Sequence, residues 1–211
     1  MDHKIQTEIA TAALRVARFV HDGRFAGIIV SGGSHQLSRA LLALGWGTLY
    51  PSEPIPRTFV LDAAGNSLLY KSTFPDERGV FRPDAEAFGD WVRKHAPGLE
   101  EMKQEHLVFV DDFMLSGVKY KDAKEFLPRY LGYTDVSFAF FVAHEDANRR
   151  DEEAFIGVKS TELASELHRM GQNMQGKEGM EELLAKVRPT AEAIRSGVLE
   201  ELREIGREMK R

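Results

Sequence analysis

Apolar residues along the chain alternate between a helical spacing and short unbroken runs. Apolar side chains at every third or fourth position predict amphipathic helices over 5–20, 36–44, 83–95 and 118–130. Unbroken apolar runs are typical of strands covered on both faces, and they predict strands over 25–30 and 107–110. β-Prone residues predict two further strands, over 58–61 and 135–142. Because helices and strands alternate, we expect an α/β fold with a mainly parallel central sheet flanked by helices.

After residue 160 the pattern favours helices alone. We predict helices over 161–170, 180–187 and 191–209, with breaks at Gly176, Gly179 and Pro189. We therefore expect an α/β core over 1–158 and a helical extension over 159–211. The last helix carries an apolar stripe, which indicates a packing face. That face would complete a hood over a ligand cleft or would pair subunits in a homo-oligomer.

Polar segments connect several of these elements. Residues 62–66 carry turn residues between the run 58–61 and a second apolar run at 67–70, which predicts a β-hairpin. The stretch 71–83 is rich in charged residues, proline and glycine, and residues 143–151 are polar and irregular, so we expect loops at both places.

Composition excludes several functional classes. The 211 residues are 43% hydrophobic and 29% charged, and the net charge of −5 provides no basic field for duplex nucleic acid. The absence of cysteine excludes disulfides, thiolate catalysis and cysteine-ligated zinc. Neither a signal-peptide core nor a membrane-spanning apolar stretch is evident, so we expect a cytoplasmic protein without a membrane partner.

Two adjacent carboxylates, Asp111 and Asp112, follow the buried run 107–110. Open α/β sheets bind their ligands at such strand ends, and buried carboxylates need hydrogen-bond donors or a cation. A sugar diol or a metal ion would meet that need. The next residues turn the chain into the helix predicted from Val118, and the first N–H groups of such a helix suit a phosphate.

A second candidate anion site follows the first predicted strand. It consists of Ser31, Gly32, Gly33 and Ser34, directly before the helix predicted over 36–44. Glycine lets a ligand approach the main chain, and the N-terminus of the helix attracts anions. A tight turn of any α/β domain is the alternative interpretation. The segment is neither a Walker A loop nor a Gly-x-Gly-x-x-Gly fingerprint.

The segment 108–117 resembles the phosphoribosyl-pyrophosphate (PRPP) motif of type I phosphoribosyltransferases, in which hydrophobic residues precede two acids, three mostly apolar residues and a Thr/Ser-Gly pair. The resemblance implies that Asp111 and Asp112 hold the ribose 2′- and 3′-hydroxyls. It also implies a 5′-phosphate loop, formed by Leu115, Ser116, Gly117, Val118 and Lys119. Lys119 stands where Thr or Ser is usual, and a lysine would meet the phosphate as a point charge.

The same resemblance makes 31–34 the pyrophosphate loop, with Ser31 where the family commonly has Arg or Lys. His35, Arg39 or Mg²⁺ would then compensate for the missing cation. A flexible loop of the family also brings a cation to the pyrophosphate, and the candidates by position are Lys71, Arg78 and Arg82. A solvated connector explains these three residues equally well. Mg²⁺ would accompany PRPP, and we assign no residue as its ligand.

Other acidic-pair families fit less well. A receiver domain begins with its acidic-pair strand, whereas half of this chain precedes Asp111. A haloacid dehalogenase needs Asp two residues after its nucleophile, where Phe113 or Met114 stands.

Three functions follow from the sequence. The first is transfer of a phosphoribosyl group from PRPP to a nucleobase or similar acceptor, with release of pyrophosphate. The second is a sensor or regulator that binds a phosphorylated ribose ligand without turnover, which the departures at Ser31 and Lys119 favour. The third is an interaction protein that keeps only the scaffold and binds through its C-terminal helices.

Overall fold

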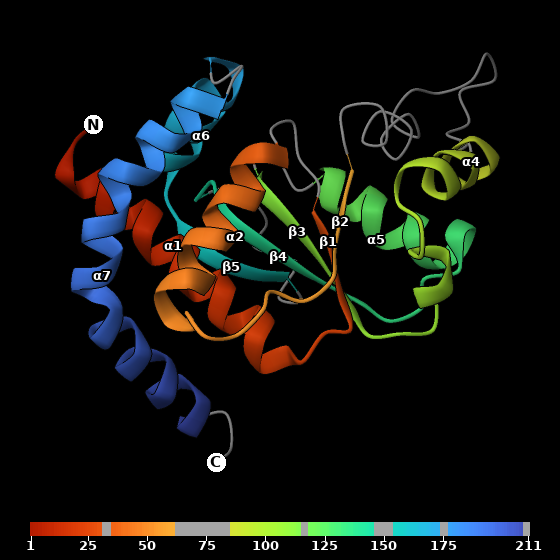
Figure 1. Cartoon of the computed structure of the whole chain (residues 1–211), viewed down its shortest axis with the longest axis horizontal. Coiled ribbons are helices and arrows are strands. Elements are labelled where there is room, and N and C mark those ends of the chain that lie inside the picture. Colours follow the sequence, from red (N-terminus) through yellow and green to blue (C-terminus); the bar gives the residue numbers. More distant parts are fainter. Residues whose placement is uncertain (31–34, 62–84, 115–117, 146–153, 174–176, 209–211) are drawn as a thin grey trace.

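The structure is a computed structural model that describes residues 1–30, 35–61, 85–114, 118–145, 154–173 and 177–208 (Figure 1). Five strands form one sheet, all parallel, in the order β2-β1-β3-β4-β5. The strands are β1 (Gly27–Val30), β2 (Thr58–Val60), β3 (Leu107–Met114), β4 (Val136–Ala143) and β5 (Ala154–Lys159). The α/β class and the parallel sheet expected from the sequence are confirmed.

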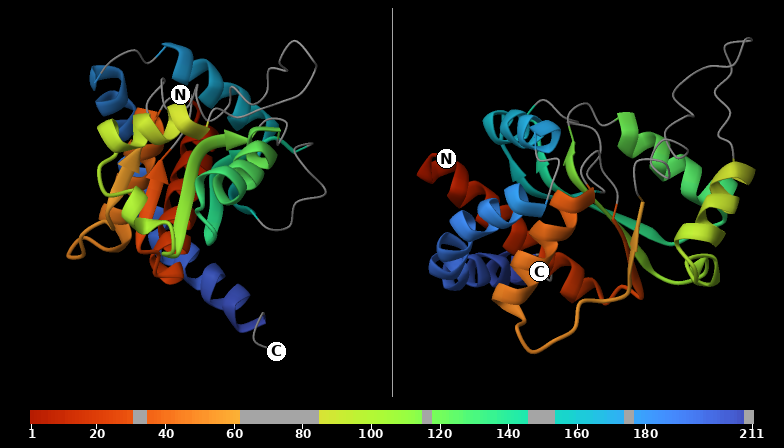
Figure 2. Two further views of the ribbon diagram at one scale, coloured as in Figure 1. Left: turned by 90° about the vertical axis from the view of Figure 1, so that its right-hand side faces the viewer. Right: turned by 45° about the horizontal axis from the view of Figure 1, so that its top comes forward.

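Helices lie on both faces of the sheet (Figure 2). They are α1 (His3–Gly23), α2 (His35–Leu49), α4 (Ala85–His95), α5 (Val118–Leu131), α6 (Thr161–Asn173) and α7 (Lys177–Glu208), with a 3-10 helix, η2 (Glu100–Met102). No helix in the described part of the chain combines the length and the apolarity that crossing a bilayer requires. The expected hairpin run 67–70 and loop 71–83 lie outside the described residues.

One face of the sheet is covered by α1, α2 and α6, and α7 packs against α1 and α2 on the side away from the sheet (Figure 1). Alternate strand residues point to this face, because successive side chains of a strand leave on opposite sides. They meet the apolar stripes of the helices in a single buried cluster that includes Ile9, Val16, Ile28, Val30, Leu41, Val108, Val110, Phe141, Leu163 and Val187. The helical spacing seen in the sequence therefore marks packing against this face.

The opposite face is covered by α4 and α5, and its core is rich in aromatic residues. Leu107 and Phe109 of β3 alternate with Val108 and Val110 and belong to this second cluster. Tyr120 of α5 packs edge-on against the Phe138 ring, with ring centroids 5.1 Å apart. The two cores together bury the central strands on both sides, as the unbroken apolar runs predict.

The backbones of α1 and α2 approach closely. A Cβ atom built on Gly45 of α2 would lie 2.6 Å from the Ala13 carbonyl carbon and 2.9 Å from the Ala17 Cβ in α1. The small residues at this crossing allow α2 to lie against α1 while its other side packs on the sheet.

Two predictions from the sequence are corrected by the C-terminal helices. We expected breaks at Gly179 and Pro189, but α7 is continuous from Lys177 to Glu208. An interior proline removes one backbone hydrogen bond and crowds the preceding turn. Here Val187 and Ala191 on either side of Pro189 are fully buried in the first core. That burial keeps the helix intact across the proline.

The fifth strand was missed by the sequence analysis. β5 pairs with β4 at the edge of the sheet, with Phe155 opposite Ala139. β5 ends at Lys159, next to the boundary expected between the α/β core (1–158) and the helical extension (159–211). The helices α6 and α7 of that extension share one core with α1 and α2. β5 is held against α1 by a hydrogen bond from Arg15 Nη1 to the Gly157 carbonyl oxygen, at 3.0 Å.

Candidate functional site

β1 and β3 lie side by side in the sheet, and the chain leaves them in opposite directions. Val30, the last residue of β1, is the register partner of Val110 in β3. From β1 the chain passes through α2 to β2 on one side, whereas from β3 it passes through α5 to β4 on the other. This arrangement defines a topological switch point, and open α/β sheets bind ligands just outside the strand ends there.

Asp111 and Asp112 lie at this switch point. The sequence placed them after the end of a strand, but β3 continues to Met114 because β4 keeps pairing with it as far as Ala143. The pair is therefore inside β3, directly beyond the last residue that pairs with β1. Both side chains are buried, with only 3% and 2% of their surfaces exposed.

Local backbone bonds hold both carboxylates. The Asp112 N–H donates to Asp111 Oδ1 at 2.8 Å, and the Phe113 N–H donates to Asp112 Oδ1 at 2.9 Å. Such bonds offset part of the desolvation cost of a buried carboxylate and restrict its rotation. A carboxylate has about four lone-pair sites, so a backbone bond and a ligand hydroxyl are compatible on the same group.

The loops predicted to bind phosphate and pyrophosphate lie outside the described residues, but their flanking elements are clear. Ser31, Gly32, Gly33 and Ser34 separate β1 from α2, and Leu115, Ser116 and Gly117 separate β3 from α5. Val118 and Lys119, expected in the phosphate loop, are the first two residues of α5. Each loop therefore precedes the N-terminus of a helix, where backbone N–H groups favour anions.

Three further candidates, Lys71, Arg78 and Arg82, fall within 62–84 and also lie outside the described residues. Their role as loop cations stays a prediction.

Helix α6 packs beside the end of β3, a contact that the sequence did not reveal. His168 packs edge-on against Phe113, the residue after Asp112, with ring centroids 5.4 Å apart. The hydroxyl of Ser160 accepts a hydrogen bond from the Leu163 N–H at 3.2 Å and so caps the start of α6, where β5 ends. The helical pattern predicted α6 itself, but only the tertiary fold brings the His168 imidazole against Phe113, the residue that follows the acidic pair.

The Mg²⁺ expected to accompany PRPP stays a prediction. Among the residues with described positions, no three His, Asp or Glu side chains form a metal-binding group. Mg²⁺ is commonly held by one or two carboxylates together with substrate phosphates. The oxygen donors of Asp111 and Asp112 suit such a shared ion.

Comparison with known proteins adds no relative to this picture: no protein-family model matches the chain, and no curated protein matches it. The resemblance to phosphoribosyltransferases therefore stays a prediction from the motif residues.

Proposed function

We propose that the chain binds PRPP or a related phosphorylated ribose and transfers the phosphoribosyl group to a nucleobase-like acceptor, releasing pyrophosphate. The observation that carries this proposal is the buried Asp111–Asp112 pair at the switch point between β1 and β3. A diol-binding pair at that place would lie between two helix N-termini, those of α2 and α5.

The proposed roles follow from the chemistry of PRPP. Its pyrophosphate is attached to ribose C1, and its phosphate is attached at the opposite end of the sugar. Neighbouring strands are about 4.8 Å apart, so loops leaving β1 and β3 can bind the two ends of one ribose. Asp111 and Asp112 would accept hydrogen bonds from the 2′- and 3′-hydroxyls between them.

The reaction exchanges one bond for another at C1. The bond from C1 to the pyrophosphate oxygen breaks, and the lone pair of an acceptor nitrogen forms a bond to C1. The proton on that nitrogen passes to the released pyrophosphate or to solvent. The electron pair leaves with the pyrophosphate, whose charge Mg²⁺ and the N–H groups at the start of α2 would stabilise. The site would contribute mainly positioning, which is a large part of catalysis in such transfers.

Binding without turnover is the second candidate function. Ser31 replaces the cation common at the pyrophosphate loop, and Lys119 replaces a hydroxyl residue at the phosphate loop. A protein with an intact diol pair and altered phosphate loops would suit a sensor of phosphorylated ribose.

The test is calorimetric titration of the full chain with PRPP and Mg²⁺, repeated with Asp111→Asn combined with Asp112→Asn. Asparagine keeps an oxygen that can accept the local N–H bonds, so the variant should remain folded, as circular dichroism will check. We expect the double variant to lose PRPP binding, whereas Glu200→Gln on the exposed part of α7 should bind as the unmodified chain does.

Unchanged affinity in the double variant would overturn the proposal, as would absence of binding in the unmodified chain. Pyrophosphate release in the presence of a panel of nucleobases then separates the two functions. Release supports the transferase, and tight binding without release with any base supports the sensor.

A further inference from the structure

A groove outside the acidic-pair site lies between α2 and the segment that leads into β2. Its volume is about 420 Å³, within the range of small-molecule pockets. It is lined by Gln36, Arg39, Ala40, Leu42, Ala43, Ile55, Pro56 and Thr58. In Figure 1 the orange trace leads from the C-terminal end of α2 to β2.

The walls of the groove are largely apolar. Ala40 and Ala43 leave the α2 side open, and Ile55 and Pro56 form the opposite side. Ile55 is 39% exposed and, with Met1, is one of two large hydrophobic side chains that are exposed among the described residues. An apolar ring system bound in the groove would cover the Ile55 side chain and remove it from water.

An arginine with no partner among the described residues lies in the same groove. Most other arginines in the described part of the chain bind a carboxylate or a carbonyl oxygen, as Arg18 does with Asp22 at 2.6 Å. Arg39 has no ion pair or hydrogen bond with another described residue. A guanidinium offers five N–H donors in a planar fork that matches a carboxylate, sulfonate or phosphate.

Two further polar groups converge on the groove. The Thr58 hydroxyl donates to the Pro56 carbonyl oxygen at 2.9 Å, which leaves its oxygen free to accept. The Gln36 side chain lies three residues before Arg39, on the same face of α2. A few polar groups in a mostly apolar pocket are typical of specific small-molecule sites.

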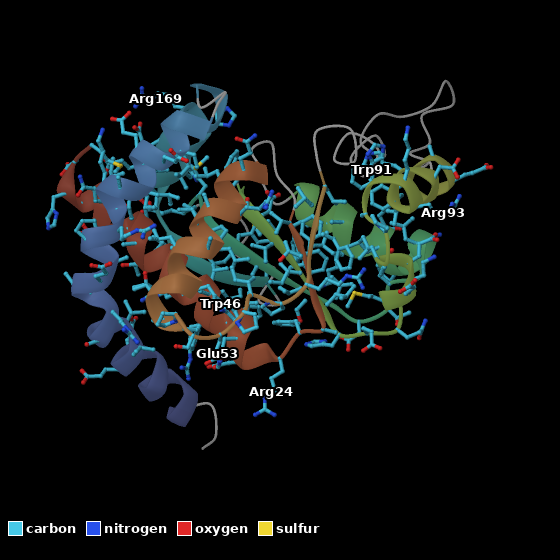
Figure 3. The ribbon with its side chains drawn as sticks, in the orientation of Figure 1. Arg24, Trp46, Glu53, Trp91, Arg93 and Arg169 are labelled. Atoms are coloured by element: carbon cyan, nitrogen blue, oxygen red, sulfur yellow. The ribbon has the colours of Figure 1, made fainter. Side chains whose placement is uncertain are left out.

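The far wall is held in place before any ligand arrives. Trp46 Nε1 donates to the Glu53 carbonyl oxygen at 2.9 Å, and the Glu53 N–H donates to the Tyr50 carbonyl oxygen at 3.1 Å. Figure 3 shows Trp46, in the last turns of α2, and Glu53 next to each other. Because this turn fixes the chain just before Ile55, little ordering cost remains for binding.

We propose that this groove binds a small amphiphilic anion, a flat apolar ring system that carries one acidic group. The ring lies between Ala40 and Ala43 on one side and Ile55 and Pro56 on the other, and the acidic group pairs with Arg39. The groove does not include the acidic pair, and it gives Arg39 a role other than the one considered for it above, compensation for the missing cation of the pyrophosphate loop.

The experiment uses two fluorescent probes with similar ring systems. Anilinonaphthalene sulfonate carries an anionic group, whereas N-phenylnaphthylamine is neutral. Three variants of the full chain are compared by titration: Arg39→Gln removes the cation, Ala43→Trp fills the groove from an exposed position on α2, and Arg188→Gln is a control on the exposed side of α7.

We expect one sulfonate probe to bind per chain, and Arg39→Gln to weaken its binding about tenfold, which corresponds to about 1.4 kcal/mol. The same variant should change binding of the neutral probe less than about twofold. Ala43→Trp should weaken both probes, and Arg188→Gln should change neither.

Absence of binding by the unmodified chain, or sulfonate binding that Arg39→Gln and Ala43→Trp leave unchanged, would overturn the proposal. Matching far-ultraviolet circular dichroism spectra and unfolding temperatures will show that all variants are folded. A crystal of the chain soaked with the sulfonate probe provides an independent measurement, because probe density away from Arg39 would also contradict the assignment.

Discussion

The close approach of α1 and α2 makes a specific prediction about two glycines of α2, Gly45 and Gly47. The change to alanine favours a helix by about 1 kcal/mol wherever space allows. Space is absent at Gly45, where the added methyl would lie 2.6 Å from the Ala13 carbonyl carbon and 2.9 Å from the Ala17 Cβ. No atom of a described residue lies within 4 Å of the same methyl at Gly47.

The magnitude follows from these contacts. The backbone of α1 cannot move aside as a flexible side chain would, so α2 must shift away from α1 and loosen the first core. Overpacking of this kind costs about 1–3 kcal/mol or more. We expect Gly45→Ala to lower the free energy of unfolding by about 1–3 kcal/mol despite its propensity gain. Gly47→Ala should raise it by about 0.5–1 kcal/mol.

Urea unfolding followed by circular dichroism measures both changes, and an unchanged slope shows that the variants unfold as the unmodified chain does. Each kcal/mol corresponds to about 2–4 °C in the unfolding temperature for a chain of this size. The two substitutions should therefore move the midpoint in opposite directions. If Gly45→Ala is as stable as Gly47→Ala, the inferred close packing of α1 against α2 is wrong.

Two further predictions test a turn and an ion pair. Gly132 has φ +76°, and among the described residues an added methyl would meet only the Lys103 Cδ, at 3.8 Å. Gly132→Ala should therefore lower the unfolding temperature through backbone strain of about 1–2 kcal/mol. Gly132→Asn should recover part of that loss, and equal unfolding temperatures for both variants would argue against strain. A hydrogen bond from Arg15 lowers the pKa of Glu201 in the folded chain. The pair should therefore stabilise the fold fully above the unfolded-state pKa of about 4.3. This contribution should be lost as the pH falls through the lower folded-state pKa. Because the pair is partly exposed, Glu201→Gln should lower the free energy of unfolding by less than about 1 kcal/mol at pH 7, and it should have no effect at pH 2. An effect that does not change with pH would contradict this reasoning.

The sequence predicted those parts of the fold that depend on local pattern. The unbroken runs that end at Val30 and Val110 became neighbouring central strands, and the spacing from Ile5 to Val20 became α1. β5 escaped prediction because its run is short and contains Gly157. A Cβ there would lie 3.1 Å from the Ala12 Cα and 2.7 Å from the Phe141 carbonyl oxygen, a constraint that appears only once α1 and β4 are in place.

The same distinction applies to the candidate site. The motif indicated Asp111 and Asp112, and their burial agrees with a need for specific partners. The sequence could not show that β3 extends past them, because that extension depends on continued pairing with β4. It also could not place His168 beside Phe113, since the two residues come from elements distant in the chain. The helix break predicted at Pro189 was wrong, because burial of the residues on both sides of Pro189 outweighs the tendency of proline to end a helix.

The central position of α1 has a consequence for the order in which the chain is synthesised. The Arg15 side chain bonds to Gly157, 142 residues later, and to Glu201, 186 residues later. At about 5–20 residues per second on a ribosome, α1 waits roughly 7–28 seconds for β5, and longer for α7. During that interval its apolar side lacks these native neighbours, so a nascent chain stalled before β5 should be a good client for chaperones that bind exposed apolar helices.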